Sequence, residues 1–100
     1  MGKLSDNQIK FFELLKSIQE SVVFQSINEM NRNKESIEDT LFNATYEVIV
    51  SLCEVLDGYN DIINLELIDK ENDLPLRTGI ELHDVCEQYL NWKNPYQTKE

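Results

Sequence analysis

Apolar residues recur at helical spacing in the first third of the chain. The stretch opens with a capping box, in which Ser5 is followed three residues later by Gln8, and Leu4 and Ile9 are placed as a hydrophobic staple. We therefore expect a helix from residue 6 to about Asn31. Its apolar positions cover more than half of the helix circumference: Ile9, Phe11, Phe12, Leu14, Leu15, Ile18, Val22, Val23, Ile27 and Met30. A stripe this wide predicts two neighbours within the fold, or one neighbour and a second chain.

A second helix is predicted from Ile37 to Leu56. Ser36 is placed to cap it, and Gly58 is a natural left-handed stop. Its predicted core face holds Ile37, Leu41, Phe42, Val48, Ile49, Leu52, Cys53 and Leu56. The opposite face is acidic, with Asp39, Asn43, Glu47, Glu54 and Asp57 within roughly 80° of one another and Val50 inside the stripe as an exposed apolar residue.

The pattern changes to strict alternation after Gly58. Ile63, Leu65 and Leu67 share one side, which predicts a strand over residues 63–68. Residues 70–73 have turn composition, and residues 74–77 can return as a second strand, which Pro75 confines to an edge. A helix over residues 61–71 is the competing interpretation.

A last helix is predicted to start at Thr78, which with Glu81 has the spacing of a capping box, and to end at Asn94-Pro95. We expect residues 96–100 to form a disordered tail. The predicted fold class is mainly α (α+β): two long antiparallel helices, a short β-hairpin and a C-terminal helix in one domain over residues 1–95.

The net charge of the chain limits the classes of molecule that it is expected to bind. The 100 residues carry a net charge of −10, and residues 35–69 contain nine carboxylates and no Lys or Arg. Such a chain would repel nucleic acid and anionic membranes, and it would attract a basic protein. Cys53 and Cys86 lie among apolar residues, as reduced core thiols do. With no signal peptide and no membrane-length apolar run, we expect a cytoplasmic protein.

The sequence contains no recognisable catalytic motif. His83 and Asp84 are adjacent, but neighbours in a helix point about 100° apart, so Asp84 does not orient the imidazole. Residues 57–61 and 69–73 resemble cation loops without matching an EF-hand, and a zinc site would need more Cys and His. We therefore expect no enzyme activity, no catalytic residues, no cofactor and no metal.

The acidic stripe is the remaining candidate site. Preset carboxylates on a rigid helix can pair with Lys and Arg of a basic protein, although a merely solvated face has the same pattern. Tyr46, Tyr59 and Trp92 are candidate aromatic anchors. The predicted partner-binding residues are Asp39, Glu47, Val50, Glu54, Asp57, Tyr59 and Asp61.

In size, charge and the residues Glu38-Asp39, Glu47, Glu54 and Asp57-Gly58-Tyr59, the chain resembles small acidic bacterial immunity proteins of nuclease bacteriocins and contact-dependent inhibition toxins. The resemblance implies a function, neutralising a toxin nuclease, and no residue roles. The alternative is a structural homodimer or small adaptor that packs through the wide apolar face of the first helix.

Overall fold

The computed structural model of the chain describes residues 3–92. Within them are three helices and one hairpin: α1 (Asp6–Asn33), α2 (Ile37–Leu56), β1 (Ile68–Asp69), β2 (Leu74–Pro75) and α3 (Leu82–Cys86). The mainly α fold class is confirmed. The predicted helix end at Asn94-Pro95 and the predicted tail at residues 96–100 lie outside the described residues.

Both long helices begin where their capping residues predict. The Ser5 side chain accepts a hydrogen bond from the Gln8 N–H, and the Gln8 side chain accepts one from the Ser5 N–H, which completes the capping box. The Ser36 hydroxyl caps α2 by accepting from the Asp39 N–H at 3.1 Å. Gly58, at φ +93°, ends α2 in the left-handed conformation that glycine adopts without strain.

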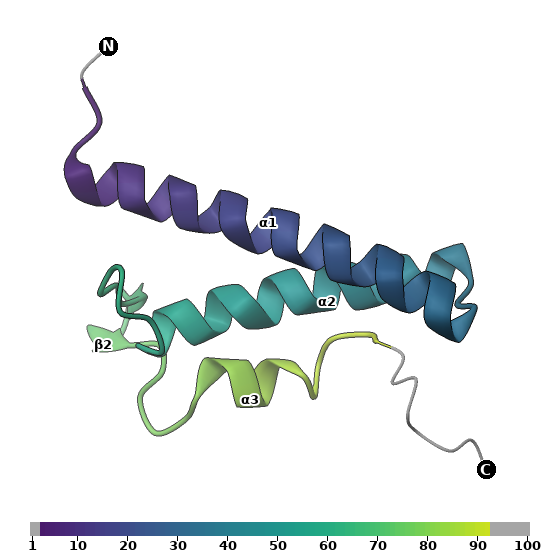
Figure 1. The fold of residues 1–100 in the computed structure, drawn as a ribbon. Coiled ribbons are helices and arrows are strands. Elements are labelled where there is room, and N and C mark those ends of the chain that lie inside the picture. Colours follow the sequence, from purple (N-terminus) through teal and green to yellow (C-terminus); the bar gives the residue numbers. More distant parts are fainter. Residues whose placement is uncertain (1–2, 93–100) are drawn as a thin grey trace.

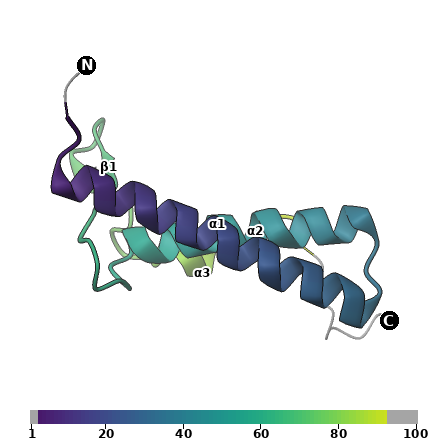
Figure 2. The ribbon, with the colours of Figure 1, turned by 45° about the horizontal axis from the view of Figure 1, so that its top comes forward.

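The three helices lie side by side with α2 in the middle. α1 and α2 run antiparallel, and α3 packs along the other side of α2 (Figures 1 and 2). Within residues 3–92, α1 and α3 do not contact each other. The molecule is therefore an open layer, and α2 is the helix that holds it together.

The hairpin is much shorter than the alternation predicts. Only Ile68 and Asp69 pair with Pro75 and Leu74, and the Leu67 carbonyl accepts one further hydrogen bond from the Leu76 N–H at 2.8 Å. Residues 63–67 have no regular secondary structure. The competing helix over 61–71 is also wrong. The turn is closed by the Asp69 carboxylate, which accepts from the backbone N–H of Glu71 at 3.0 Å.

The last helix starts later and ends earlier than predicted. Thr78 does not cap it, because its hydroxyl donates to the Pro75 carbonyl, and Gly79 adopts φ +77° in the following turn. The helix begins at Leu82 and ends after five residues. Tyr89, which lies beyond the observed end of the helix, is 83% exposed.

The core is small, and the predicted core face of α2 is largely uncovered. Within residues 3–92, the buried apolar side chains are Val22, Tyr46, Val55 and Ile63. Ile37 and Leu41 are 74% and 61% exposed. The reason is the position of α3, which approaches α2 on the side of Tyr46 and Asp57 and contacts the predicted face only at its edge, at Cys53.

Candidate protein-interaction site

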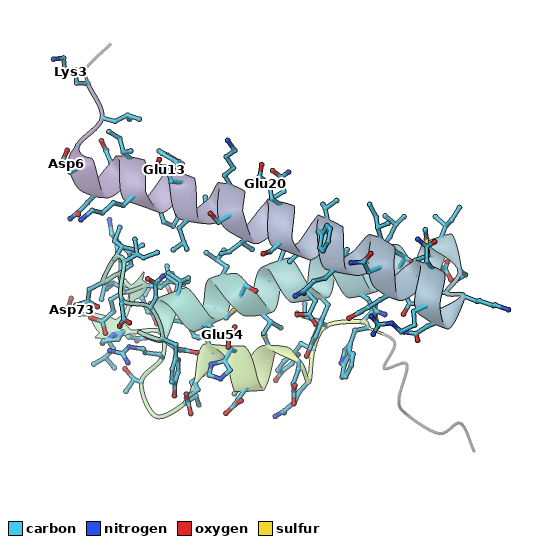
Figure 3. All side chains as sticks on the ribbon, in the orientation of Figure 1. Lys3, Asp6, Glu13, Glu20, Glu54 and Asp73 are labelled. Carbon is cyan, nitrogen blue, oxygen red and sulfur yellow. The ribbon has the colours of Figure 1, made fainter. Side chains whose placement is uncertain are left out.

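The predicted acidic stripe follows the length of α2. From Asp39 to Glu54 it spans about 22 Å at the helical rise per residue. Glu47 and Glu54 are exposed, whereas Val50 is half-buried and not the exposed apolar residue that the sequence predicts. Figure 3 shows Glu54 on the side of α2 that carries α3, whereas Glu13 and Glu20 of α1 point away from α2.

Glu47 lies in a concentration of like charge. Partial burial of its carboxylate raises the pKa of Glu47 above its ordinary value, and the negative charges of Glu29 and Glu54 raise it further. We call Glu29, Glu47 and Glu54 the carboxylate cluster. Among residues 3–92, the one ion pair that involves Lys or Arg joins Arg77 to Glu66, at 3.2 Å. The carboxylate cluster is therefore not neutralised within the described part of the chain.

Asp57 is not part of the exposed stripe. It is only 8% exposed, and its carboxylate accepts hydrogen bonds from the backbone N–H groups of Leu82 and His83, both at 2.9 Å. The His83 ring nitrogen Nδ1 contacts the same carboxylate at 2.7 Å. Asp57 thus caps the N-terminus of α3. The sequence pattern places Asp57 in the acidic stripe of α2 and does not predict this contact.

The Asp57–His83 pair changes the protonation of both groups. Burial alone would raise the pKa of Asp57, but the hydrogen bonds from His83 and Leu82 outweigh it and leave that pKa below its ordinary value. The hydrogen bond to Asp57 raises the pKa of His83. The sequence missed this partner of His83 because the two residues are 26 positions apart.

The surroundings of His83 do not form a nucleophile–base arrangement. Its outer nitrogen, Nε2, faces Asp84 at 3.5 Å and Glu81 at 3.9 Å. Within the described residues, no hydroxyl or thiol lies within hydrogen-bonding distance of Nε2. A histidine surrounded by carboxylates is suited to holding a proton, and it has no group here to activate.

Asp57, Glu81 and His83 also place one possible metal-ligating atom each within 4.8 Å of one another. Both oxygens of Asp57 already accept hydrogen bonds, and the His83 nitrogen nearest to it is one of the donors. The cluster is therefore explained by the capping of α3.

Tyr59 and Asp61 follow the end of α2. Tyr59 is 63% exposed and lies edge-on to the His83 ring, with ring centroids 5.2 Å apart, while its hydroxyl donates to Glu81. Asp61 is exposed in the next loop. Both remain accessible to a partner, and Tyr59 is held in place by its contacts.

Tyr46 and Trp92 contact each other. Their rings stack with centroids 4.7 Å apart, and the Tyr46 hydroxyl donates to Glu87 at 3.3 Å. Burial and the charge of Glu87 raise the pKa of Tyr46 to about 12. These aromatics attach the residues after α3 to α2. Tyr46 is buried, whereas Trp92 is still 37% exposed.

Glu29 is the member of the carboxylate cluster that sequence reasoning missed. It belongs to α1, which carries three basic and four acidic residues and no acidic stripe, and only the antiparallel packing of α1 on α2 brings its charge close to Glu47. The spacing of residues within α2 therefore cannot predict that Glu29 lies close to Glu47.

No protein-family model, curated protein or solved structure matches the chain. None of the described helices has the length and apolarity needed to cross a membrane.

Proposed function

We propose that this chain is a non-enzymatic binding module that neutralises a basic protein, and that the partner docks on the carboxylate cluster of α1 and α2. The observation that carries the proposal is the packing of α1 against α2, which brings the charge of Glu29 close to Glu47 beside Glu54, with no Lys or Arg of the described residues paired to any of the three. Mutual repulsion makes this arrangement unfavourable in the isolated chain, and a basic partner relieves it.

The placement of the cluster suits rapid and specific association. Glu47 and Glu54 are fixed on the central helix two turns apart, so little backbone order has to be gained on binding. The net charge of −10 attracts a basic protein over a distance comparable to the screening length of the buffer. Tyr59, exposed and held by His83 and Glu81, supplies an aromatic contact at one end of the stripe.

We further propose that the partner is a toxin nuclease and that the chain acts in the cytoplasm as its immunity protein. A nuclease carries Lys and Arg that bind phosphate, and a carboxylate stripe competes for those side chains. The resemblance in size and charge to immunity proteins supports this class of partner.

Affinity capture tests the proposal. The tagged chain is incubated with lysate of its native cell, and separately with the purified product of the neighbouring gene, at low and at physiological salt. We expect one basic protein to be retained at physiological salt, to have nuclease activity and to lose that activity when the chain is added.

Retention of many basic proteins that all elute as the salt approaches physiological concentration would contradict the proposal, because exposed charge pairs without specific contacts are screened at that ionic strength. A retained protein with no nuclease activity would contradict the immunity assignment and leave only the binding function.

A further inference from the structure

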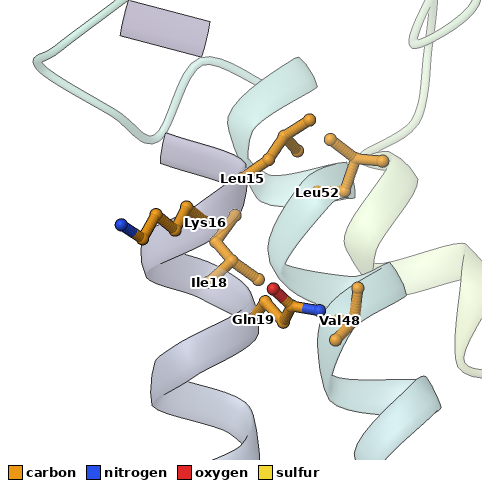
Figure 4. A pocket seen from close by; sticks show the side chains of 6 residues that line it. All are labelled: Leu15, Lys16, Ile18, Gln19, Val48 and Leu52. Atoms are coloured by element: carbon orange, nitrogen blue, oxygen red, sulfur yellow. The ribbon is translucent and has the colours of Figure 1, made fainter. Parts of the chain in front are cut away.

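An apolar surface extends over the side of α1 and α2 where their shared groove opens. The groove is a hollow of about 490 Å³ lined by Leu15, Lys16, Ile18 and Gln19 of α1 and by Val48 and Leu52 of α2 (Figure 4). A second hollow follows on α2, lined by Glu38, Leu41, Phe42 and Thr45. Since residues 41, 45, 48 and 52 form one helical stripe, the two hollows are successive parts of the same surface.

On α1 the same surface continues beyond the groove. Phe12, Lys16, Gln19, Val23 and Ile27 follow one another at spacings of three or four residues and so share one stripe. Lys16 and Gln19 line the groove, which places the stripe at its edge. Phe12, Val23 and Ile27 are 53%, 51% and 51% exposed. We call the two stripes of α1 and α2 together the apolar face.

The uncovered area matches what a stable dimer needs. The chain exposes 8151 Å², whereas a monomer of its mass is expected to expose about 5,900 Å². The chain therefore exposes about 2,250 Å² more than a compact monomer would, and two copies that each cover about 1,000 Å² of this excess bury about 2,000 Å² in all. Interfaces of stable homodimers begin at this size.

We propose that the apolar face binds a second copy of this chain, so that two α1–α2 hairpins form a four-helix arrangement. The face carries Lys16, and Glu20 lies one turn away at its edge, so a two-fold arrangement can pair a base of each copy with an acid of the other. The carboxylate cluster is not among the residues of this face, and Glu47 and Glu54 stay accessible in the dimer.

The oligomeric state of the full chain tests the proposal by sedimentation velocity and light scattering from about 1 to about 100 µM. We expect a species of twice the 11.7 kDa chain mass. Because two copies of charge −10 repel each other, the dimer should tighten as salt rises. A complex with a basic protein should weaken as salt rises, so failure of one proposal is distinguishable from failure of the other.

Two neighbouring substitutions on α1 assign the surface. Val23→Glu introduces a charge into the apolar face and should raise the dimer dissociation constant at least about tenfold. Phe24→Glu is the matched control, since Phe24 is 69% exposed and points about 100° away from Val23, so dimerisation should be unchanged. Circular dichroism confirms that both variants keep their helices.

A monomer at every concentration and salt tested would overturn the proposal, as would a dimer that Val23→Glu leaves intact.

Discussion

Asp57 is the residue whose position most changes the interpretation of this chain. α3 has no side-chain cap from its own N-cap residue, Glu81, and Asp57 supplies that cap from the end of α2. The same carboxylate holds the His83 ring. A single buried charge therefore connects the central helix to α3.

Replacing Asp57 with Asn should destabilise the protein. Asparagine keeps one acceptor oxygen but loses the charge and the second acceptor, so we expect a loss of about 2–3 kcal/mol in the free energy of unfolding. Urea denaturation measures it. The control is Asp61→Asn, which removes the same charge from an exposed position and should change stability little. Equal effects of the two substitutions would contradict the capping role.

The Asp57–His83 pair predicts a pH optimum of stability. The lowered pKa of Asp57 gives stability that is present above its unfolded pKa near 4 and is lost as the pH falls through the folded value. The raised pKa of His83 gives stability that is present below its unfolded pKa near 6.5 and is lost as the pH rises through the folded value.

We therefore expect the pair to contribute most between about pH 4 and about pH 6.5, measured as the melting temperature from about pH 3 to about pH 9. His83→Gln should flatten the alkaline side of the profile. A variant profile that parallels the wild type would show that His83 does not contribute.

Glu47 should behave as a functional residue that costs stability. Removing its charge with Glu47→Gln relieves the repulsion from Glu29 and Glu54, so the melting temperature should stay the same or rise. Affinity for the basic partner should fall about three- to tenfold, as for an interface charge. Thermal melts and titration calorimetry measure the two effects. A loss of stability would indicate a structural role.

At the scale of elements, the bounds of α1 and α2 are determined by capping residues close to them in the sequence, whereas the start of α3 is not. α3 contacts only α2 among the described elements, through the Asp57 cap and the Cys53–Cys86 contact. The residues that follow α3 are held on α2 by the stacked pair Tyr46 and Trp92. Five residues of helix with few buried contacts form a weak cooperative unit.

We expect α3 to detach before the long helices unfold. Trp92 is the one tryptophan of the chain, and its stacking on Tyr46 makes its fluorescence a probe of this attachment. In urea, the fluorescence transition should have a lower midpoint than the loss of helical circular dichroism. Coincident transitions would mean that the three helices unfold as one unit.

The same division explains what the sequence could predict. Ser5 with Gln8, Ser36 and Gly58 act on neighbouring residues, and the bounds they predict for α1 and α2 are confirmed within two residues. The start of α3 depends on Asp57, 25 residues earlier, so Thr78 was a misleading signal. The sequence did not predict Glu29 as part of the site for a similar reason, because only the packing of α1 on α2 brings it close to Glu47.

At the scale of the whole molecule, the open layer has two distinct surfaces, the carboxylate cluster and the apolar face. The carboxylate cluster repels its own members and lacks a described counter-charge, while the apolar face leaves Leu41 61% exposed. The sequence predicted a single apolar face on α2 as the core. The structure leaves most of that face exposed, because α1 covers only one edge of it and α3 lies elsewhere.

The most direct test of the central claim compares two double charge reversals for binding of the captured basic protein. Glu47→Lys with Glu54→Lys reverses the stripe on α2. Asp6→Lys with Glu13→Lys makes the same change in charge at the same spacing on α1, where residues seven apart share a face and Glu13 points away from α2 (Figure 3). We predict that the first pair weakens binding by about a hundredfold or more at physiological salt, with the fold intact by circular dichroism, and that the second weakens it only through net charge, by less than about tenfold. Equal losses in both variants would contradict the account, because they would show that the partner responds to the charge of the chain as a whole and not to the carboxylate cluster.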